Sequence, residues 1–97
     1  MLPPFCIRGR IPMKIHVDVI PYSDEDCICI ELVPDAKIKC RKSDGEFLIQ
    51  ANREGLQFLA KVCLTLAQED VPAGNHVHFD GFDFFESDNV DITIERA

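Results

Sequence analysis

The stretch NREGLQFLAKVCLTLAQEDVP, residues 52–72, decides the predicted fold because its apolar residues recur with the spacing of a helix. Asn52 is a suitable N-cap, and Pro72 with Gly74 ends the run. The apolar residues that share one side of the helical wheel, and are expected to face the core, are Leu56, Leu59, Ala60, Cys63, Leu66 and Ala67. The rest of the chain is arranged around this single predicted helix.

Two residues near the start of the helix depart from its pattern. Gly55 costs up to about 1 kcal/mol relative to alanine, so we expect it where the helix approaches the sheet closely. Phe58 falls on the polar side of the wheel and is expected to be exposed.

Flanking segments alternate apolar and polar residues with the period of a β-strand. This alternation predicts strands at residues 13–19, 27–32, 36–41, 47–51, 77–79 and 90–95. Asp44 and Gly45 favour a hairpin turn, whereas residues 81–89 read as a connection. The predicted class is α+β, a mostly antiparallel sheet of about five to six strands with one helix packed on one face.

One helix covers only one face of such a sheet, so the other face must meet solvent or a partner. The alternation places a charged mosaic without an obvious pocket on that face, made of Lys14, His16, Cys27, Cys29, Glu31, Lys37, Lys39, Arg41, His76, His78, Asp91 and Glu95.

The length of 97 residues predicts one domain. Residues 1–12 contain three prolines and lack the pattern of a secretory signal, so we expect a flexible extension there and the domain at residues 13–97, with Met13 resembling a start. No apolar run reaches the roughly 20 residues that cross a bilayer, so no membrane contact is predicted.

The net charge of −7 is concentrated at one end of the chain. Acids and bases balance over residues 1–68, whereas residues 69–97 hold eight acids against Arg96 alone. Such a field repels phosphate backbones, which disfavours direct nucleic-acid binding, and attracts basic surfaces. Solubility is the alternative role of these acids.

The five cysteines are odd in number and contain no CxxC pair, so a disulfide scaffold is not expected. Most stand among apolar residues, which predicts buried thiols in a reducing cytosol.

His76, His78 and Asp80 share one face of a predicted strand, with Cβ atoms about 6 to 7 Å apart. Zinc would need a third or fourth ligand, and none has the spacing of a metal motif, so we predict neither a metal site nor a cofactor. An interface or a hydrogen-bond network are the other uses of this pattern.

A phenylalanine-rich segment follows the histidines and is interleaved with acids. Its four rings are Phe79, Phe82, Phe84 and Phe85. Either exposed rings among them anchor a basic partner, or Phe79, Phe82 and Phe85 plug the open end of the core. The sequence leaves both interpretations open.

The second half of the chain resembles the immunity proteins of bacterial polymorphic toxin systems, and within them immunity protein family thirty-two. A helix opened by Glu54, Gly55 and Leu56, then a Gly-x-His-x-His strand and a final apolar strand, carries the resemblance. The residues concerned are Ala51, Asn52, Glu54, Gly55, Leu56, Leu59, Ala60, Leu66, Ala67, Pro72, Gly74, His76 and His78.

The resemblance implies a cytoplasmic protein, not an enzyme, that binds and neutralises a cognate toxin domain stoichiometrically. An acidic inhibitor suits a basic toxin, and a nuclease is one such toxin. We expect a monomer or weak homodimer. The predicted toxin-binding surface consists of His76, His78, Asp80, Asp83, Glu86 and Asp88. The alternatives are a small metal-binding enzyme that uses the two histidines, and a homodimeric adaptor module.

Overall fold

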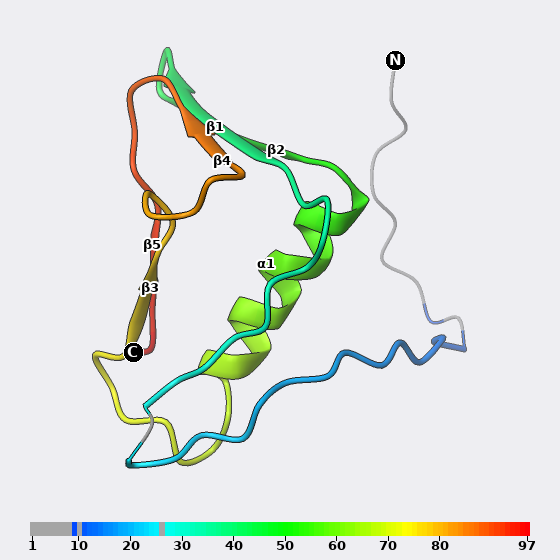
Figure 1. Ribbon diagram of the computed structural model, residues 1–97. Helices are drawn as coiled ribbons and strands as arrows, with labels where there is room; N and C mark the ends of the chain where they lie inside the picture. Colours follow the sequence, from blue (N-terminus) through cyan, green and yellow to red (C-terminus); the bar gives the residue numbers. More distant parts are fainter. Residues whose placement is uncertain (1–8, 10, 26) are drawn as a thin grey trace.

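The computed structural model describes residues 9, 11–25 and 27–97 (Figure 1). These residues form β1 (Ile38–Ser43), β2 (Glu46–Ala51), α1 (Arg53–Leu66), β3 (His76–His78), β4 (Phe85–Ser87) and β5 (Thr93–Glu95). β1 lies between β2, its antiparallel neighbour, and β4, its parallel neighbour, while β3 and β5 form a separate antiparallel pair. The predicted α+β class is confirmed, but the described strands form two sheets instead of one.

The β1–β2 hairpin follows the prediction closely. Asp44 and Gly45 both have positive φ, 51° and 76°, and Ser43 pairs with Glu46 across them. Two consecutive positive φ angles are the mark of the tight hairpin turn whose twist matches that of the strands. Local turn chemistry therefore sets the register of this hairpin.

The connection predicted at residues 81–89 is wrong, because it contains β4. Phe85 pairs with Ile38 and Glu86 with Lys39 in the parallel register. Beyond β4, the side chain of Asn89 donates to the carbonyl of Lys42 at 2.8 Å and accepts from its N–H at 3.1 Å. A strand of three residues is too short for alternation to reveal, and a distant part of the chain supplies its partner.

The strands predicted at residues 13–19 and 27–32 are also wrong. Residues 11–22 and 28–37 contain no strand, and Ser23 and Cys27 form one isolated bridge. Alternation shows that a segment has one apolar side, but a strand also needs a neighbour to bond with, and the described chain places none there. The described residues between 11 and 37 are therefore irregular apart from this bridge.

Helix α1 begins and ends near the predicted residues but is turned differently. Its buried residues are Gly55, Phe58, Val62, Thr65 and Leu66. Phe58 is fully buried, whereas Leu56 is 56% exposed and Cys63 is exposed. The buried row is displaced by one residue, about 100° around the axis, from the predicted one. The predicted exposure of Phe58 is therefore wrong, and the predicted apolar side is right only in part, since Leu66 is buried and Leu59 packs against the core.

The phenylalanines explain this orientation. The ring of Phe58 makes edge contacts with Phe79, Phe82 and Phe84 at centroid distances of 6.1, 5.2 and 5.1 Å. Phe79 is fully buried, and Phe82, Phe84 and Phe85 pack against the core. Burying one large ring among others outweighs the smaller apolar side chains of the opposite face. The interpretation that these rings plug the core is confirmed.

The junction between β2 and α1 is held by Asn52. Its side-chain oxygen accepts from the N–H of Gly55 at 2.7 Å and of Lys37 at 2.9 Å, and its nitrogen donates to the carbonyl of Asp35 at 2.8 Å. The N-cap prediction is confirmed. A Cβ on Gly55 would collide with the carbonyl oxygen of Lys37, which confirms the predicted close approach.

Among the described cysteines Cys40 alone is buried, while Cys27, Cys29 and Cys63 are exposed free thiols. The expectation of mostly buried thiols is therefore wrong, because two of the exposed cysteines lie in the irregular segment and the third on the solvent side of α1.

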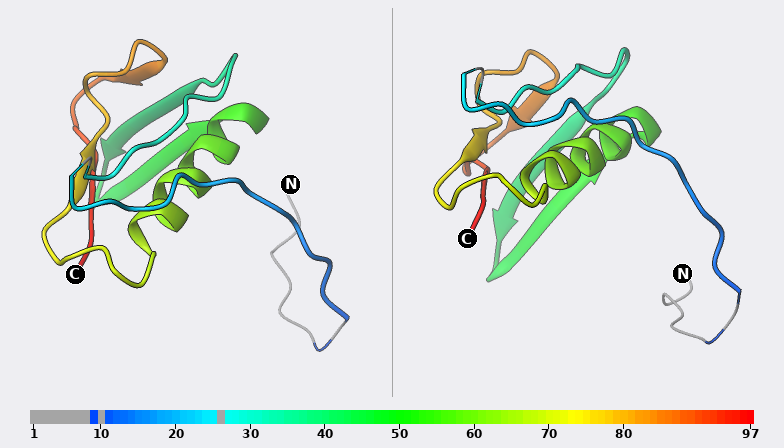
Figure 2. Two further views of the ribbon diagram at one scale, coloured as in Figure 1. Left: turned by 60° about the horizontal axis from the view of Figure 1, so that its bottom comes forward. Right: turned by 90° about the horizontal axis from the view of Figure 1, so that it is seen from below.

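The amino-terminal region runs beside the helix. The side chain of Gln68 accepts from the N–H of Tyr22 at 2.9 Å and donates to the carbonyl of Ile20 at 3.1 Å, which ties this region to the end of α1. In both views of Figure 2, α1 lies between residues 11–19 and the β1–β2 hairpin. The extension predicted at residues 1–12 falls largely outside the described residues.

Candidate functional site

The three-stranded sheet has a buried side and a charged outer side. Ile38 and Cys40 are buried, so the intervening Lys39 and Arg41 of β1 point to the outer side. Lys39 has Glu86 of β4 as its paired residue on one flank and Gln50 of β2 on the other. The basic centre strand is thus bordered by a carboxylate and an amide.

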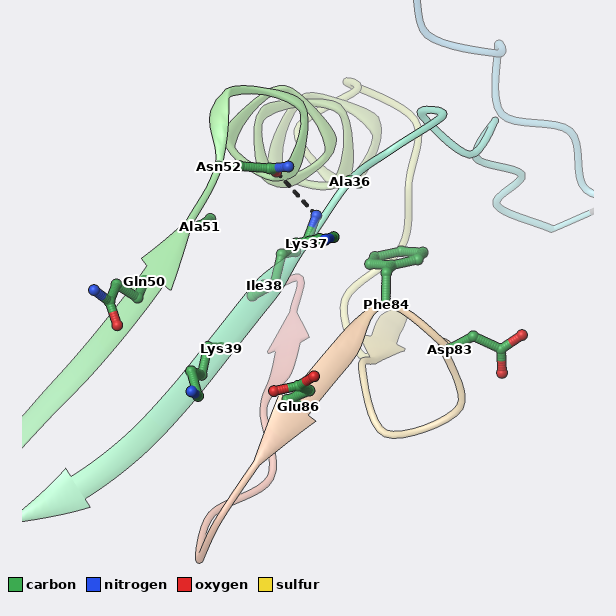
Figure 3. Close-up of a pocket in the computed structure, with 10 residues that line it drawn as sticks. All are labelled: Ala36, Lys37, Ile38, Lys39, Gln50, Ala51, Asn52, Asp83, Phe84 and Glu86. Atoms are coloured by element: carbon green, nitrogen blue, oxygen red, sulfur yellow. Dashed lines mark hydrogen bonds between the residues drawn. The ribbon is translucent and has the colours of Figure 1, made fainter.

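An open pocket of about 500 Å³ lies where β1, β2 and the approach to β4 meet (Figure 3). Its polar side chains come from Lys37, Lys39, Gln50, Asn52, Asp83 and Glu86. Ile38, Ala51 and Phe84 contribute apolar surface. Figure 3 shows Lys39 and Glu86 on the same side of the sheet, on neighbouring strands. The sequence predicted no obvious pocket on the uncovered, charged face of the sheet, whereas the structure has one there.

The charges around this pocket are not neutralised by close pairing. Within the described residues no lysine or arginine nitrogen lies within 4 Å of a carboxylate oxygen, and the one comparable contact joins Nδ1 of His76 to Oε1 of Glu95 at 3.9 Å. Lys39 and Glu86 occupy paired positions without forming an ion pair within 4 Å. Two lysines and two carboxylates therefore present unpaired charges that a partner can contact.

The six predicted site residues are all exposed, and the structure places them in separate groups. Asp83 and Glu86 line the same pocket. Asp88 lines a smaller neighbouring pocket of about 120 Å³ that shares Lys39 with the first. Asp80 is the second residue after β3 and lines neither of these two pockets.

His76 and His78 lie on the two-stranded sheet. The Nδ1 of His76 is 2.8 Å from the carbonyl oxygen of Gly74, to which it donates, and the Nδ1 of His78 is 2.8 Å from the hydroxyl of Thr93. Their rings meet edge to face at 4.7 Å. These contacts connect β3 to β5 and to its own preceding turn, which is the hydrogen-bond network considered from the sequence.

The described residues contain no group of three or more histidine, cysteine, aspartate or glutamate side chains placed to hold a metal ion. Nor is any described helix long and apolar enough to pass through a bilayer.

The sequence located part of this pocket and missed the rest. Lys37 and Lys39 belong to the predicted uncovered face and Phe84 to the predicted phenylalanine-rich segment, but Gln50 was not singled out. Its alternation with the apolar Ile49 and Ala51 indicates that Gln50 lies on the outer side of the sheet. Nothing local indicates that Phe84 lies beside these lysines, because its place depends on the pairing of β4 with β1. Of the other predicted face residues, the following lie outside the two sheets: Lys14, His16, Cys27, Cys29, Glu31 and Asp91.

Comparison with curated proteins and with solved structures finds no match. The family model of Immunity protein 32 matches residues 46–97, which include β2, α1, the phenylalanine cluster and every predicted site residue. The match spans more than half of the chain and agrees with the resemblance seen in the helix and the His-x-His strand. The chain therefore belongs to the Immunity protein 32 family.

Proposed function

We propose that this protein binds a cognate toxin domain in the cytoplasm and neutralises it stoichiometrically, without catalysis. The observation that carries the proposal is the match of the Immunity protein 32 family over residues 46–97. The unpaired charges on the outer side of the three-stranded sheet support it, since surfaces of this kind steer and specify protein association.

The proposed contact surface is the set of residues predicted from the sequence, namely His76, His78, Asp80, Asp83, Glu86 and Asp88. Asp83 and Glu86 are its proposed centre because both line the pocket beside Phe84, which adds an aromatic surface. Aromatic anchors surrounded by charges are typical of binding hot spots. The lysines of the same pocket would pair with acids of the toxin, so recognition would use both signs of charge.

A charge reversal tests the surface. Asp83→Lys combined with Glu86→Lys is compared with Glu25→Lys combined with Glu69→Lys, which changes the net charge equally at exposed positions outside the pocket. The cognate toxin domain is titrated calorimetrically with each variant. We expect the first pair to weaken binding at least about 100-fold and to abolish protection of growing cells, because like charges across an interface cost several kcal/mol.

Equal protection by both double variants would remove Asp83 and Glu86 from the contact. Non-catalytic inhibition is tested separately by titrating toxin activity. Activity should fall in proportion to the inhibitor and reach its minimum at a fixed molar ratio, whereas loss of activity at small substoichiometric amounts would contradict the proposal.

A further inference from the structure

The outer edge of β2 has no strand beside it in the described sheet. In this hairpin Ser43 and Glu46 form the hydrogen-bonded pair next to the turn. At the other end of the hairpin, the N–H of Asn52 donates to the carbonyl of Lys37 at 3.1 Å, which fits the same alternation of hydrogen-bonded pairs. Bonded and non-bonded pairs alternate in an antiparallel ladder. The backbone N–H and C=O groups of Phe47 and Ile49 therefore point away from β1, toward the free edge.

The side chains of these two residues are exposed as well. Phe47 and Ile49 pair with Lys42 and Cys40, so they lie on the side of the sheet that carries the buried Cys40. They remain 48% and 41% exposed because the core does not extend over them. The free edge thus combines unbonded backbone groups with exposed apolar side chains, a combination that favours addition of another strand.

The amino-terminal segment, residues 11–19, has the properties of the missing strand. Its odd-numbered residues are all apolar, and Ile11, Met13 and Ile15 are 98%, 82% and 75% exposed. It has no strand partner in the described chain. One lysine and one aspartate leave it close to neutral, so its docking on an acidic protein meets little charge repulsion.

We propose that residues 11–19 of one copy add as a strand to the free edge of β2 in a second copy, and that the exchange is reciprocal. With odd-numbered residues opposite Phe47 and Ile49, apolar side chains meet apolar side chains across the strands. In the antiparallel form the nitrogen of Pro12, an even-numbered residue, points away from β2, so its missing N–H costs no bond there. Proline at the new outer edge also discourages further growth of the sheet.

The geometry favours a second copy over the same chain. Ile20 and Tyr22 are tied to Gln68 at the end of α1, and residues 15–18 run past Gln57 and Lys61 of the helix. In both views of Figure 2 the helix stands between this segment and the hairpin. The segment would have to leave its contacts and pass around α1 to reach its own β2.

The oligomeric state of the full chain tests the proposal. Light scattering after gel filtration should give twice the monomer mass of 11.0 kDa. Ile15→Lys or Ile49→Lys should each raise the dimer dissociation constant at least about 10-fold, because either one puts a charge into the paired apolar face. Leu64→Lys, at a comparably exposed position on the helix, is the control and should leave the dimer intact. Circular dichroism checks that each variant is folded.

Hydrogen exchange provides the second readout. The amides of Phe47 and Ile49 should be protected in the dimer and lose protection in Ile15→Lys. A monomer at about 200 μM with rapid exchange at both amides would overturn the proposal, since dimers of useful strength populate well below that concentration. A monomer with protected amides would overturn it too, because the segment would then fold onto its own edge. Either outcome leaves toxin binding as a separate question.

Discussion

Gly55 lies directly against the backbone carbonyl of Lys37, so the first turn of α1 approaches the start of β1 more closely than any residue with a Cβ could. The same two residues share the side chain of Asn52, which accepts from both of their N–H groups. The junction of β2 and α1 is thus held against the start of β1, next to the two lysines of the pocket, Lys37 and Lys39.

Gly55→Ala should destabilise the fold. Alanine is better than glycine in a helix by up to about 1 kcal/mol. The new methyl group would meet a backbone oxygen that cannot rotate away, and overpacking of this kind costs about 1–3 kcal/mol. Because the overpacking cost exceeds the helix gain over most of these ranges, urea unfolding should show a net loss of up to about 3 kcal/mol. Gly81→Ala, where a Cβ meets open space, should change stability by less than about 0.5 kcal/mol. A stabilised Gly55→Ala would contradict the close approach.

Asn52→Ala should lower the free energy of unfolding by about 0.5–2 kcal/mol, the usual range for the loss of an N-cap. Asn52→Asp keeps the accepting oxygen but loses the donor to Asp35, so its loss should be smaller. Thermal unfolding of both variants separates capping from the bridge to Asp35. Equal losses would mean that the cap itself contributes little.

Arg96, which is distant in sequence, places a positive charge at the carboxyl end of α1, because the last turn of the helix has no basic residue of its own. Its Nη1 donates to the carbonyls of Leu66 and Gln68 at 2.7 and 2.8 Å. Arg96→Met should destabilise the protein by about 1–2 kcal/mol through the lost charged hydrogen bonds and helix-dipole interaction. Arg53→Met, at the exposed start of α1, should be within about 0.5 kcal/mol of the parent in denaturant unfolding.

Burial raises the pKa of the Cys40 thiol. The unfolded chain ionises this thiol at its ordinary pKa, while the folded chain keeps it protonated, so stability should fall as the pH rises above that value, near 8.5. The fall between pH 7 and pH 10 should be smaller in Cys40→Ala. In the folded protein, peptide-resolved alkylation should modify Cys40 at least about 10-fold more slowly than the exposed Cys63. Comparable rates would contradict the burial of Cys40.

The candidate site was only partly predictable. Lys37 and Lys39 follow from the alternation of β1, and the acids at 83 and 86 were visible as part of the acidic end of the chain. The sequence did not predict that these lysines and acids line one pocket, because their arrangement depends on the parallel pairing of β4 with β1. The two histidines were grouped with those acids by nearness in sequence, whereas the structure places them on the other sheet.

Short-range chemistry is what the amino-acid sequence by itself determined. The helix between Asn52 and Leu66 and the turn at Asp44 and Gly45 depend on periodicity, φ preference and capping within a few residues. The tertiary structure alone decided which side of α1 is buried, where β4 pairs, and that residues 13–19 gain no neighbouring strand within the described chain. Those outcomes depend on packing and pairing between distant segments. Phe58 faces the core because three other phenylalanine rings pack there, and no local sequence pattern predicts that these rings come together.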